Sequence, residues 1–204
     1  MSTPRRDTGL TGAGTALLLL AFMAGGPVVG AGEAEPAAAA PAAAGTVVVD
    51  TTLGRMVIAL DEEAAPRTVA QFRRLVAAGW YDGRPFYRVV AGHVIQAGDG
   101  GENDQPTVPG EFGLPHGVGA VGLARDEDPD SGSTEFYVCL APRPHLDGRY
   151  AVFGQVVEGL EVLAAIGAVA VTEKWLGEGE PRVAFHEPVE PVEIERAWLA
   201  PAAP

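Results

Sequence analysis

Short apolar runs rich in β-branched residues follow one another through the chain after residue 45, separated by glycine, proline and acidic residues. Residues 46–60 contain two such runs on either side of Thr52, Leu53 and Gly54, which predicts a β-hairpin. The run at 86–100 predicts a buried strand, and further strands are expected at 119–124, 134–141, 150–157 and within 187–199. The pattern is typical of a mainly-β domain.

Two segments instead carry apolar residues at helical spacing. In 61–79, acidic residues come first, Pro66 lies early and Gly79 closes the segment, as expected for a helix. Its apolar positions fall on one helix face: Val69, Phe72, Leu75 and Val76. A shorter helix is expected at 159–167. Many short strands with two helices predict a β-barrel or sandwich whose ends the helices close.

The N-terminal segment differs from the rest of the chain. Arg5 and Arg6 precede an uncharged stretch with an apolar centre, and a Val-Gly-Ala sequence ending at residue 31 offers a small-residue cleavage site. We predict a signal peptide at 1–31 and export to the periplasm or cell envelope. The alternative is an uncleaved inner-membrane anchor through 13–31, although two glycines and a proline interrupt that stretch.

Low-complexity sequence separates this segment from the strands. Residues 32–45 consist mostly of alanine and proline without a periodic face, which predicts a flexible linker. The remainder, 46–200, has the length of one ordinary domain.

Composition narrows the classes of partner. The formal net charge of −13 argues against nucleic acids and anionic membranes. Cys139 is the only cysteine, so no internal disulfide is possible and the fold must rely on its hydrophobic core.

Three motif-like stretches lack the context that their chemistry needs. Gly117, Gly119 and Gly122 match a dinucleotide fingerprint but lead into a strand-like segment where a helix is required. The acidic loop starting at Asp126 departs from the EF-hand pattern. No serine elbow or paired-histidine motif occurs. We therefore expect neither a metal nor another cofactor.

Strand parity separates two faces in 135–140, because residues two apart share a side of a strand. One face is apolar, with Phe136, Val138 and Leu140, and the other carries Glu135, Tyr137 and Cys139. Arg88, inside the apolar run at 86–100, poses a further question, since a guanidinium is costly to bury without a partner. It either reaches solvent at an edge or lies in a cleft that receives a ligand.

Three blocks taken together resemble the cyclophilin family of peptidyl-prolyl cis-trans isomerases: "FYRVVAGHVIQAGD", "LARDEDPDSGSTEFYV" and "LDGRYAVFGQV". The resemblance spans roughly Thr46 to Leu199, in the family's order. It implies an eight-stranded antiparallel closed barrel capped by two α-helices, and an enzyme that binds proline-containing segments of folding proteins, most simply as a monomer. Together with the predicted signal peptide, this predicts a bacterial, exported isomerase.

The resemblance also implies roles for individual residues. Arg88 aligns with the family's catalytic arginine, and Gln96 with a glutamine that contacts the peptide backbone. A proline-ring pocket would be formed by His93, Val94, Tyr137 and Leu146. Further substrate contacts would come from Ala124, Arg125, Glu135, His145 and Tyr150.

Several of these positions depart from the family's usual residues. His93 and Tyr137 stand in place of phenylalanines, Val94 in place of methionine, and Glu135 in place of glutamine, which makes the pocket more polar. His145 replaces the tryptophan linked to cyclosporin binding, so we expect poor cyclosporin affinity. Glu135 either pairs with Arg88 or Arg125 or lies in solvent.

These departures leave two functions open. The first is an isomerase acting on exported proteins as they fold. The second is a catalytically weak module that binds proline-containing peptides or acts as a chaperone. If His93 points into the pocket, its titration would change proline binding around neutral pH.

Overall fold

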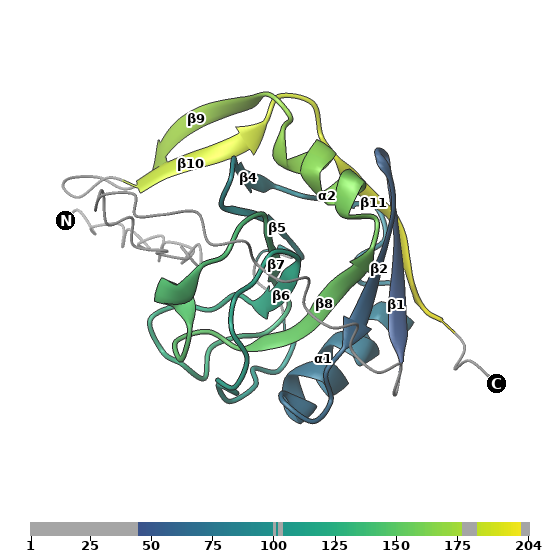
Figure 1. The fold of residues 1–204 in the computed structure, drawn as a ribbon, viewed down its shortest axis with the longest axis vertical. Helices are drawn as coiled ribbons and strands as arrows, with labels where there is room; N and C mark the ends of the chain where they lie inside the picture. Colours follow the sequence, from purple (N-terminus) through teal and green to yellow (C-terminus); the bar gives the residue numbers. More distant parts are fainter. Residues whose placement is uncertain (1–44, 100, 102–103, 177–182, 201–204) are drawn as a thin grey trace, which may run out of the picture.

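The computed structural model describes residues 45–99, 101, 104–176 and 183–200 (Figure 1). The predicted signal peptide or anchor at 1–31, and all but the last residue of the predicted linker at 32–45, lie outside the described residues. No helix in the described part of the chain is long and apolar enough to cross a membrane.

A nine-stranded antiparallel sheet dominates the structure, in the order β3-β11-β1-β2-β8-β6-β7-β5-β4. Its strands are β1 (Thr46–Thr51), β2 (Gly54–Leu60), β3 (Arg84–Pro85), β4 (Arg88–Val90), β5 (Val94–Ala97), β6 (Ala120–Leu123), β7 (Phe136–Cys139), β8 (Val152–Glu158) and β11 (Glu193–Leu199). A separate hairpin pairs β9 (Val171–Leu176) with β10 (Val183–Pro188).

The two edge strands of this sheet belong to one continuous segment. β3 pairs with β11 and β4 pairs with β5, and only Phe86 and Tyr87 separate β3 from β4. The Phe86 amide also donates to the Val192 carbonyl, at 2.8 Å. Counted as one segment, β3 and β4 bring the ends of the sheet together, so eight segments form the ring. The mainly-β fold with two helices is confirmed.

The structure corrects one strand prediction and shortens another. The run at 86–100 forms β4 and β5 instead of one strand, because the chain turns at Gly92, whose φ is 64°, and the His93 amide donates to Val90. The terminal strand expected within 187–199 is present as β11, but it begins only at Glu193. Glu187 and Pro188 end β10, which belongs to a hairpin that the sequence pattern did not reveal.

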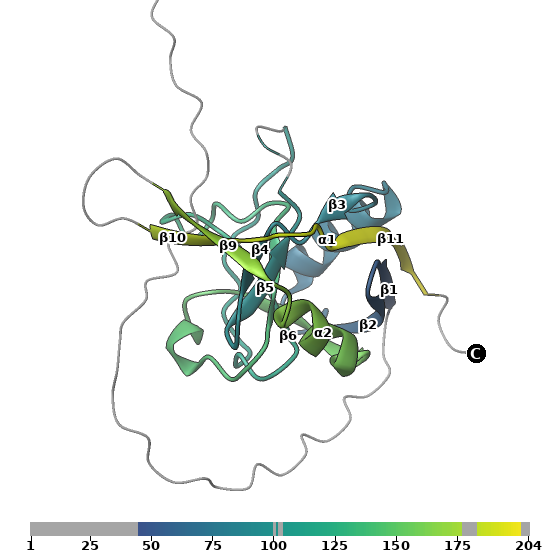
Figure 2. The same ribbon diagram turned by 90° about the horizontal axis from the view of Figure 1, so that it is seen from above.

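Helix α1 (Pro66–Ala77) begins at a proline that needs no hydrogen-bond acceptor and buries the predicted apolar face. Its first turn is capped from another part of the chain, because the Glu111 carboxylate accepts from the backbone amides of Arg67 and Thr68, at 3.1 and 2.9 Å. Helix α2 (Leu160–Gly167) lies at the opposite end of the ring (Figure 2). The two helices therefore cover different ends of the same core.

Strand parity produces two hydrophobic clusters. The inner cluster draws side chains from every segment of the ring and from both helices, including Phe72, Phe136 and Phe153. The outer cluster lies on the other face of the wall and consists of Val94, Ala120, Ala124, Tyr137, Cys139, Leu146, Tyr150 and Val152. The predicted split of β7 into two faces is thus present in the structure.

Candidate active site

Arg88 lies on the outer face of β4, directly opposite Gln96 of β5. Its residue is only 8% exposed, and its Nη1 donates to the Gln96 Oε1 atom, at 3.0 Å. Burial lowers the pKa of the guanidinium, while Tyr87, Glu135 and Tyr150 act in the opposite direction. The side chain neither runs out into solvent nor forms an ion pair among the described residues, so it occupies the interior of a polar network.

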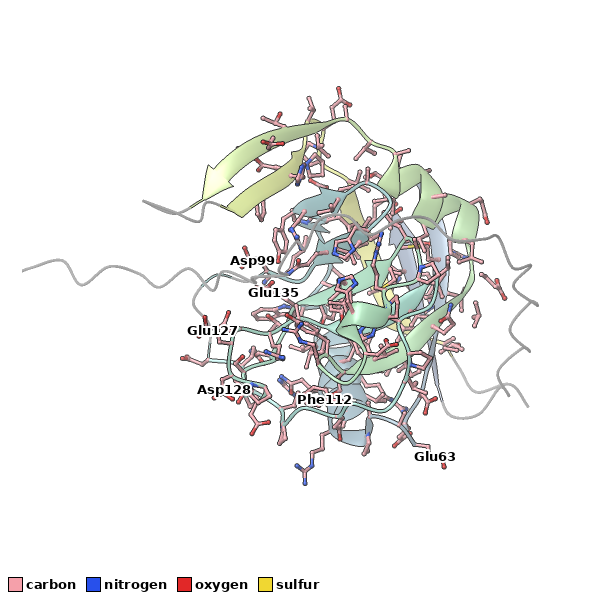
Figure 3. The ribbon with its side chains drawn as sticks, turned by 60° about the vertical axis from the view of Figure 1, so that its left-hand side comes forward. Glu63, Asp99, Phe112, Glu127, Asp128 and Glu135 are labelled. Carbon is pink, nitrogen blue, oxygen red and sulfur yellow. The ribbon has the colours of Figure 1, made fainter. Side chains whose placement is uncertain are left out.

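Glu135 completes this network without contacting an arginine. Its Oε2 accepts a 2.8 Å hydrogen bond from Gln96 Nε2 and another from the Tyr87 hydroxyl. Burial raises the pKa of its carboxyl, the hydrogen bond from Tyr87 lowers it, and Asp99, which lies beside it in Figure 3, raises it further. Of the alternatives left open, neither an ion pair with Arg88 or Arg125 nor full solvation is found. Glu135 instead fixes the orientation of the Gln96 amide, whose oxygen then faces Arg88.

The predicted ring-pocket residues lie together but pack against one another. Val94, Tyr137 and Leu146 are 0%, 0% and 2% exposed, and they share the outer cluster with Ala124 and Tyr150. The same burial raises the pKa of the Cys139 thiol to about 12, so the thiol stays protonated at neutral pH. These side chains form a closed, mainly apolar cluster with almost no exposed surface.

Two functional candidates escaped the sequence analysis. The Tyr137 hydroxyl is 2.8 Å from Nε2 of His116, and Nδ1 of His116 is 2.8 Å from Oδ1 of Asp147. Because the Asp147 carboxylate can only accept, Nδ1 of His116 carries the hydrogen and donates to it, which leaves Nε2 to accept a hydrogen bond from the Tyr137 hydroxyl. No motif marked His116, and Asp147 entered only as part of the third block that resembles the family, without a role of its own. The available signal for His116 was the hydroxyl of Tyr137, which needs a partner when buried.

The glycine motif has a structural explanation at this place. Gly122 lies opposite Tyr137 in the β6–β7 ladder, and a Cβ atom there would be 2.3 Å from Tyr137 Cζ. Gly119 adopts φ 76° just before β6. The glycines therefore make room for the tyrosine ring and the turn.

His93 and His145 form the rim of the outer cluster. Their rings stack with centroids 5.9 Å apart. Burial lowers the pKa of His93 to about 4, with additional repulsion from Arg143, Arg88 and His145. His93 is therefore neutral at physiological pH, and the charge change expected near neutrality moves to about pH 4.

Arg125 lies on the other side of Tyr150, with its Cζ atom 4.5 Å from the ring centroid. Its Nε and Nη2 donate to the Arg149 carbonyl, at 3.1 and 2.7 Å. Arg125, Tyr150 and Arg149 line a pocket of about 340 Å³ together with Asp126 and Glu127. Tyr150 thus connects the open pocket to the closed outer cluster.

The comparison with protein families decides the classification. The model of the family described as cyclophilin type peptidyl-prolyl cis-trans isomerase/CLD matches residues 46–197. The chain belongs to this family. Its enzyme class is accordingly that of the peptidyl-prolyl cis-trans isomerases.

Individual cyclophilins show how far the similarity extends. The peptidyl-prolyl cis-trans isomerase ppi1 of Schizosaccharomyces pombe is 34% identical over 167 residues, covering 74% of this chain and 96% of that protein. The crystal structure of cyclophilin AquaCyp293 from Hirschia baltica matches with a TM-score of 0.61 at 27% identity, covering 74% and 72%. A cyclophilin type isomerase from Cryptosporidium parvum, whose structure was determined in the presence of the dipeptide Ala-Pro, shares the fold with a TM-score of 0.65 at 21% identity, covering 76% and 99%.

The β9–β10 hairpin adds a wall to the site of this cyclophilin. β10 packs against β4 (Figure 1). The Phe185 ring stacks on Tyr87 with centroids 5.9 Å apart. Tyr87 is therefore held between Phe185 and the Glu135 carboxylate. Both contacts restrict the residue next to Arg88 in the chain.

Proposed function

We propose that this cyclophilin accelerates cis-trans isomerisation of X-Pro bonds in exported proteins during their folding, with Arg88 as the catalytic residue. The carrying observation is the state of the Arg88 guanidinium. Gln96 holds it through one hydrogen bond, and among the described residues no other hydrogen bond from it is recorded. A guanidinium has five N–H donors, so most of them remain available to a peptide.

The chemistry needs a donor more than it needs an acid or a nucleophile. Rotation about an X-Pro bond crosses a barrier of roughly 18 to 20 kcal/mol because partial double-bond character is lost. In the twisted state the prolyl nitrogen regains its lone pair, and a fixed N–H of Arg88 would hydrogen-bond to it more strongly than to the planar amide. The guanidinium is suited to this because it stays protonated at all physiological pH values.

Arg88 alone accounts for only part of a useful acceleration. A hydrogen bond to a charged group contributes about 1.5 to 3 kcal/mol, which is roughly one to two decades of rate. The remainder must come from gripping the proline ring against an apolar surface, for which Leu146, Val94 and Tyr137 are the candidates. Peptide backbone contacts would come from Gln96.

Prolyl exchange on a panel of X-Pro peptides tests the proposal. Exchange would be followed by NMR with the full-length protein, with Arg88→Ala, and with Arg67→Ala as a control on the exposed side of α1. We expect exchange with the wild type and the control, and a loss of about 10- to 100-fold in Arg88→Ala. Equal exchange in Arg88→Ala would contradict the role of Arg88, and no exchange in any protein would contradict the activity.

A second function is favoured by the closed outer cluster. Because Val94 and Tyr137 have no exposed surface, a proline ring must displace neighbouring side chains before it is gripped. A weak module that recognises proline-containing segments, or a chaperone, would be consistent with that arrangement. Saturable peptide binding without exchange in the wild type would identify it.

Export is tested separately from activity. The N-terminus of the chain, isolated after expression with its native leader, would be determined by mass spectrometry in the periplasmic and membrane fractions. We expect a periplasmic protein that begins at Gly32. A protein that retains Met1 in the membrane fraction would support the anchor, and one that retains it in the cytosol would contradict export.

A further inference from the structure

Arg143 is a second arginine beside the outer cluster, and its guanidinium has no recorded partner among the described residues. Its Nε atom is buried and makes no hydrogen bond. Such an atom loses its water without a replacement, which costs free energy and calls for an explanation. The side chain is half-buried, so part of it remains accessible to a ligand.

The backbone holds Arg143 in one place. Pro142 and Pro144 flank it, which restricts its conformation, and its amide donates to the His116 carbonyl, at 2.7 Å. The short helix η1 (Pro144–Leu146) follows at once and carries His145 and Leu146. The backbone of Arg143 is therefore fixed next to the predicted proline-ring pocket, so binding would have to order only its side chain.

The charges around the site differ between the end near Glu135 and the end near Arg143. Glu135 lies under the influence of Asp99 and Asp126, which repel a further anion. At the other end, His93 is repelled by Arg143 and His145. Asp147 is the acidic group at that end, and its Oδ1 is already engaged by the backbone amide and ring of His116. Of these two ends, the one near Arg143 has the charges that favour a bound anion.

We propose that Arg143 binds the side-chain carboxylate of an acidic residue close to the proline, so that the preferred substrates are X-Pro segments carrying Glu or Asp. A planar carboxylate matches the fork of a guanidinium and would bind the part of the Arg143 guanidinium that remains accessible. The stacked imidazoles of His93 and His145 add donors beside it. This inference rests on the proposed function of the same site. It goes beyond that function because it specifies which proline segments are chosen.

The net charge of −13 makes such a preference informative. The protein as a whole repels acidic peptides, so a general electrostatic attraction would favour basic ones. A preference for acidic peptides must come from a local cation.

The test uses two series of N-acetylated, C-amidated peptides with Glu, Gln or Lys either before the proline or within two positions after it. Dissociation constants by NMR titration and exchange rates would be measured for full-length wild type, Arg143→Gln and the control Arg67→Gln, which makes the same charge change on α1. In at least one series we expect wild type and Arg67→Gln to prefer Glu over Gln by about tenfold, or 1.4 kcal/mol. We expect Arg143→Gln to lose this preference.

Two further measurements keep the proposal testable if Arg143→Gln folds poorly. Arg143→Glu is expected to reverse the preference in favour of Lys. In the wild type alone, the preference for Glu should shrink as salt rises to 0.5 M. The Debye length is then about 4 Å, so the attraction within a half-exposed ion pair is largely screened. Equal affinity for Glu and Gln in both series, or a preference that survives in Arg143→Gln, would overturn the proposal. Failure of exchange with retained selectivity would contradict only the isomerase activity.

Discussion

The inner and outer faces of the barrel wall use the same strands and differ in how they satisfy buried polar atoms. On β7, Phe136 and Val138 enter the inner cluster, where apolar contacts dominate. Tyr137, between them, enters the outer cluster, where its hydroxyl belongs to a chain of hydrogen bonds with His116. The inner cluster thus relies mainly on apolar contacts, whereas the outer cluster also buries polar atoms in hydrogen bonds, a departure from simple packing that is common at functional sites.

The outer face gains from this a set of positioned polar groups. Arg88 and Gln96 alternate with inner-facing Val89 and Ile95 on adjacent strands. Arg88 is hydrogen-bonded to Gln96, and Gln96 to Glu135. Glu135 in turn accepts a hydrogen bond from Tyr87. The comparison indicates that the inner face stabilises the fold and that the outer face orients the side chains of Arg88 and Gln96.

The largest effect should follow from damage to the inner face. Phe136 makes ring contacts with Phe72, Tyr81 and Phe86, so Phe136→Ala leaves a cavity in the centre of the barrel. We expect a loss of about 3 to 5 kcal/mol in the free energy of unfolding, measured by urea titration. A loss below about 1 kcal/mol would show that the inner cluster does not carry the stability assigned to it.

Glu135→Gln should damage the outer face and leave the inner one intact. The amide retains one acceptor but no charge, so the orientation of Gln96 toward Arg88 is weakened. We expect kcat/KM to fall about tenfold, which corresponds to about 1.4 kcal/mol. The control is Glu63→Gln, an exposed acidic residue well separated from Glu135 in Figure 3. Unchanged kcat/KM in Glu135→Gln would contradict the orienting role.

The same variant gives a pH dependence of stability. Because burial raises the folded-state pKa of Glu135 above its unfolded value, the folded state binds the proton more tightly. The stabilisation by that proton is complete below the unfolded pKa and is lost as pH rises through the folded pKa. We therefore expect wild type to gain stability relative to Glu135→Gln as pH falls from 7 to 4. A relative loss over that interval would contradict the direction of the shift.

Tyr137→Phe should produce a smaller change and sharpen the comparison. Without the hydroxyl, Nε2 of the buried His116 loses its partner, so we expect a destabilisation of about 1 kcal/mol by urea titration. Exchange activity should be retained, because the ring that we propose to contact proline is still present. A large loss of activity would mean that the hydroxyl itself takes part in binding or catalysis.

The smallest effect is expected for His93, whose titration should leave the exchange rate unchanged between pH 5.5 and 8. With its pKa lowered to about 4 by burial and nearby cations, His93 stays neutral from pH 5.5 to 8. The ratio of wild-type to His93→Phe exchange rates should therefore be constant over that range. A step near pH 6.5 in this ratio would show that His93 keeps its ordinary pKa.

Much of the fold followed from periodicity. Parity on β7 separated Phe136 from Tyr137 correctly, and helical spacing located the buried face of α1. These patterns succeed because burial imposes a period of 2 on strands and 3.6 on helices. Strand boundaries were less accurate, since the turn at Ala91, Gly92 and His93 interrupts the apolar run over only three residues.

The site was predicted only in part. The resemblance pointed to Arg88 and Gln96, which the structure brings together, but could not show that Glu135 binds Tyr87 and Gln96 instead of an arginine. Contacts between distant segments, such as His116 with Tyr137, depend on the three-dimensional fold and leave no local pattern. The unpaired Nε of Arg143 is likewise a property of packing.

Exchange catalysed by Arg88→Lys tests the central claim most directly, because lysine keeps the charge and removes the fork that Gln96 holds. If the outer face works by orienting a guanidinium, NMR exchange with an Ala-Pro peptide should fall about tenfold or more, close to the value for Arg88→Ala, while the free energy of unfolding changes by less than about 1.5 kcal/mol. Exchange by Arg88→Lys at the wild-type rate would contradict the account, since charge alone would then suffice.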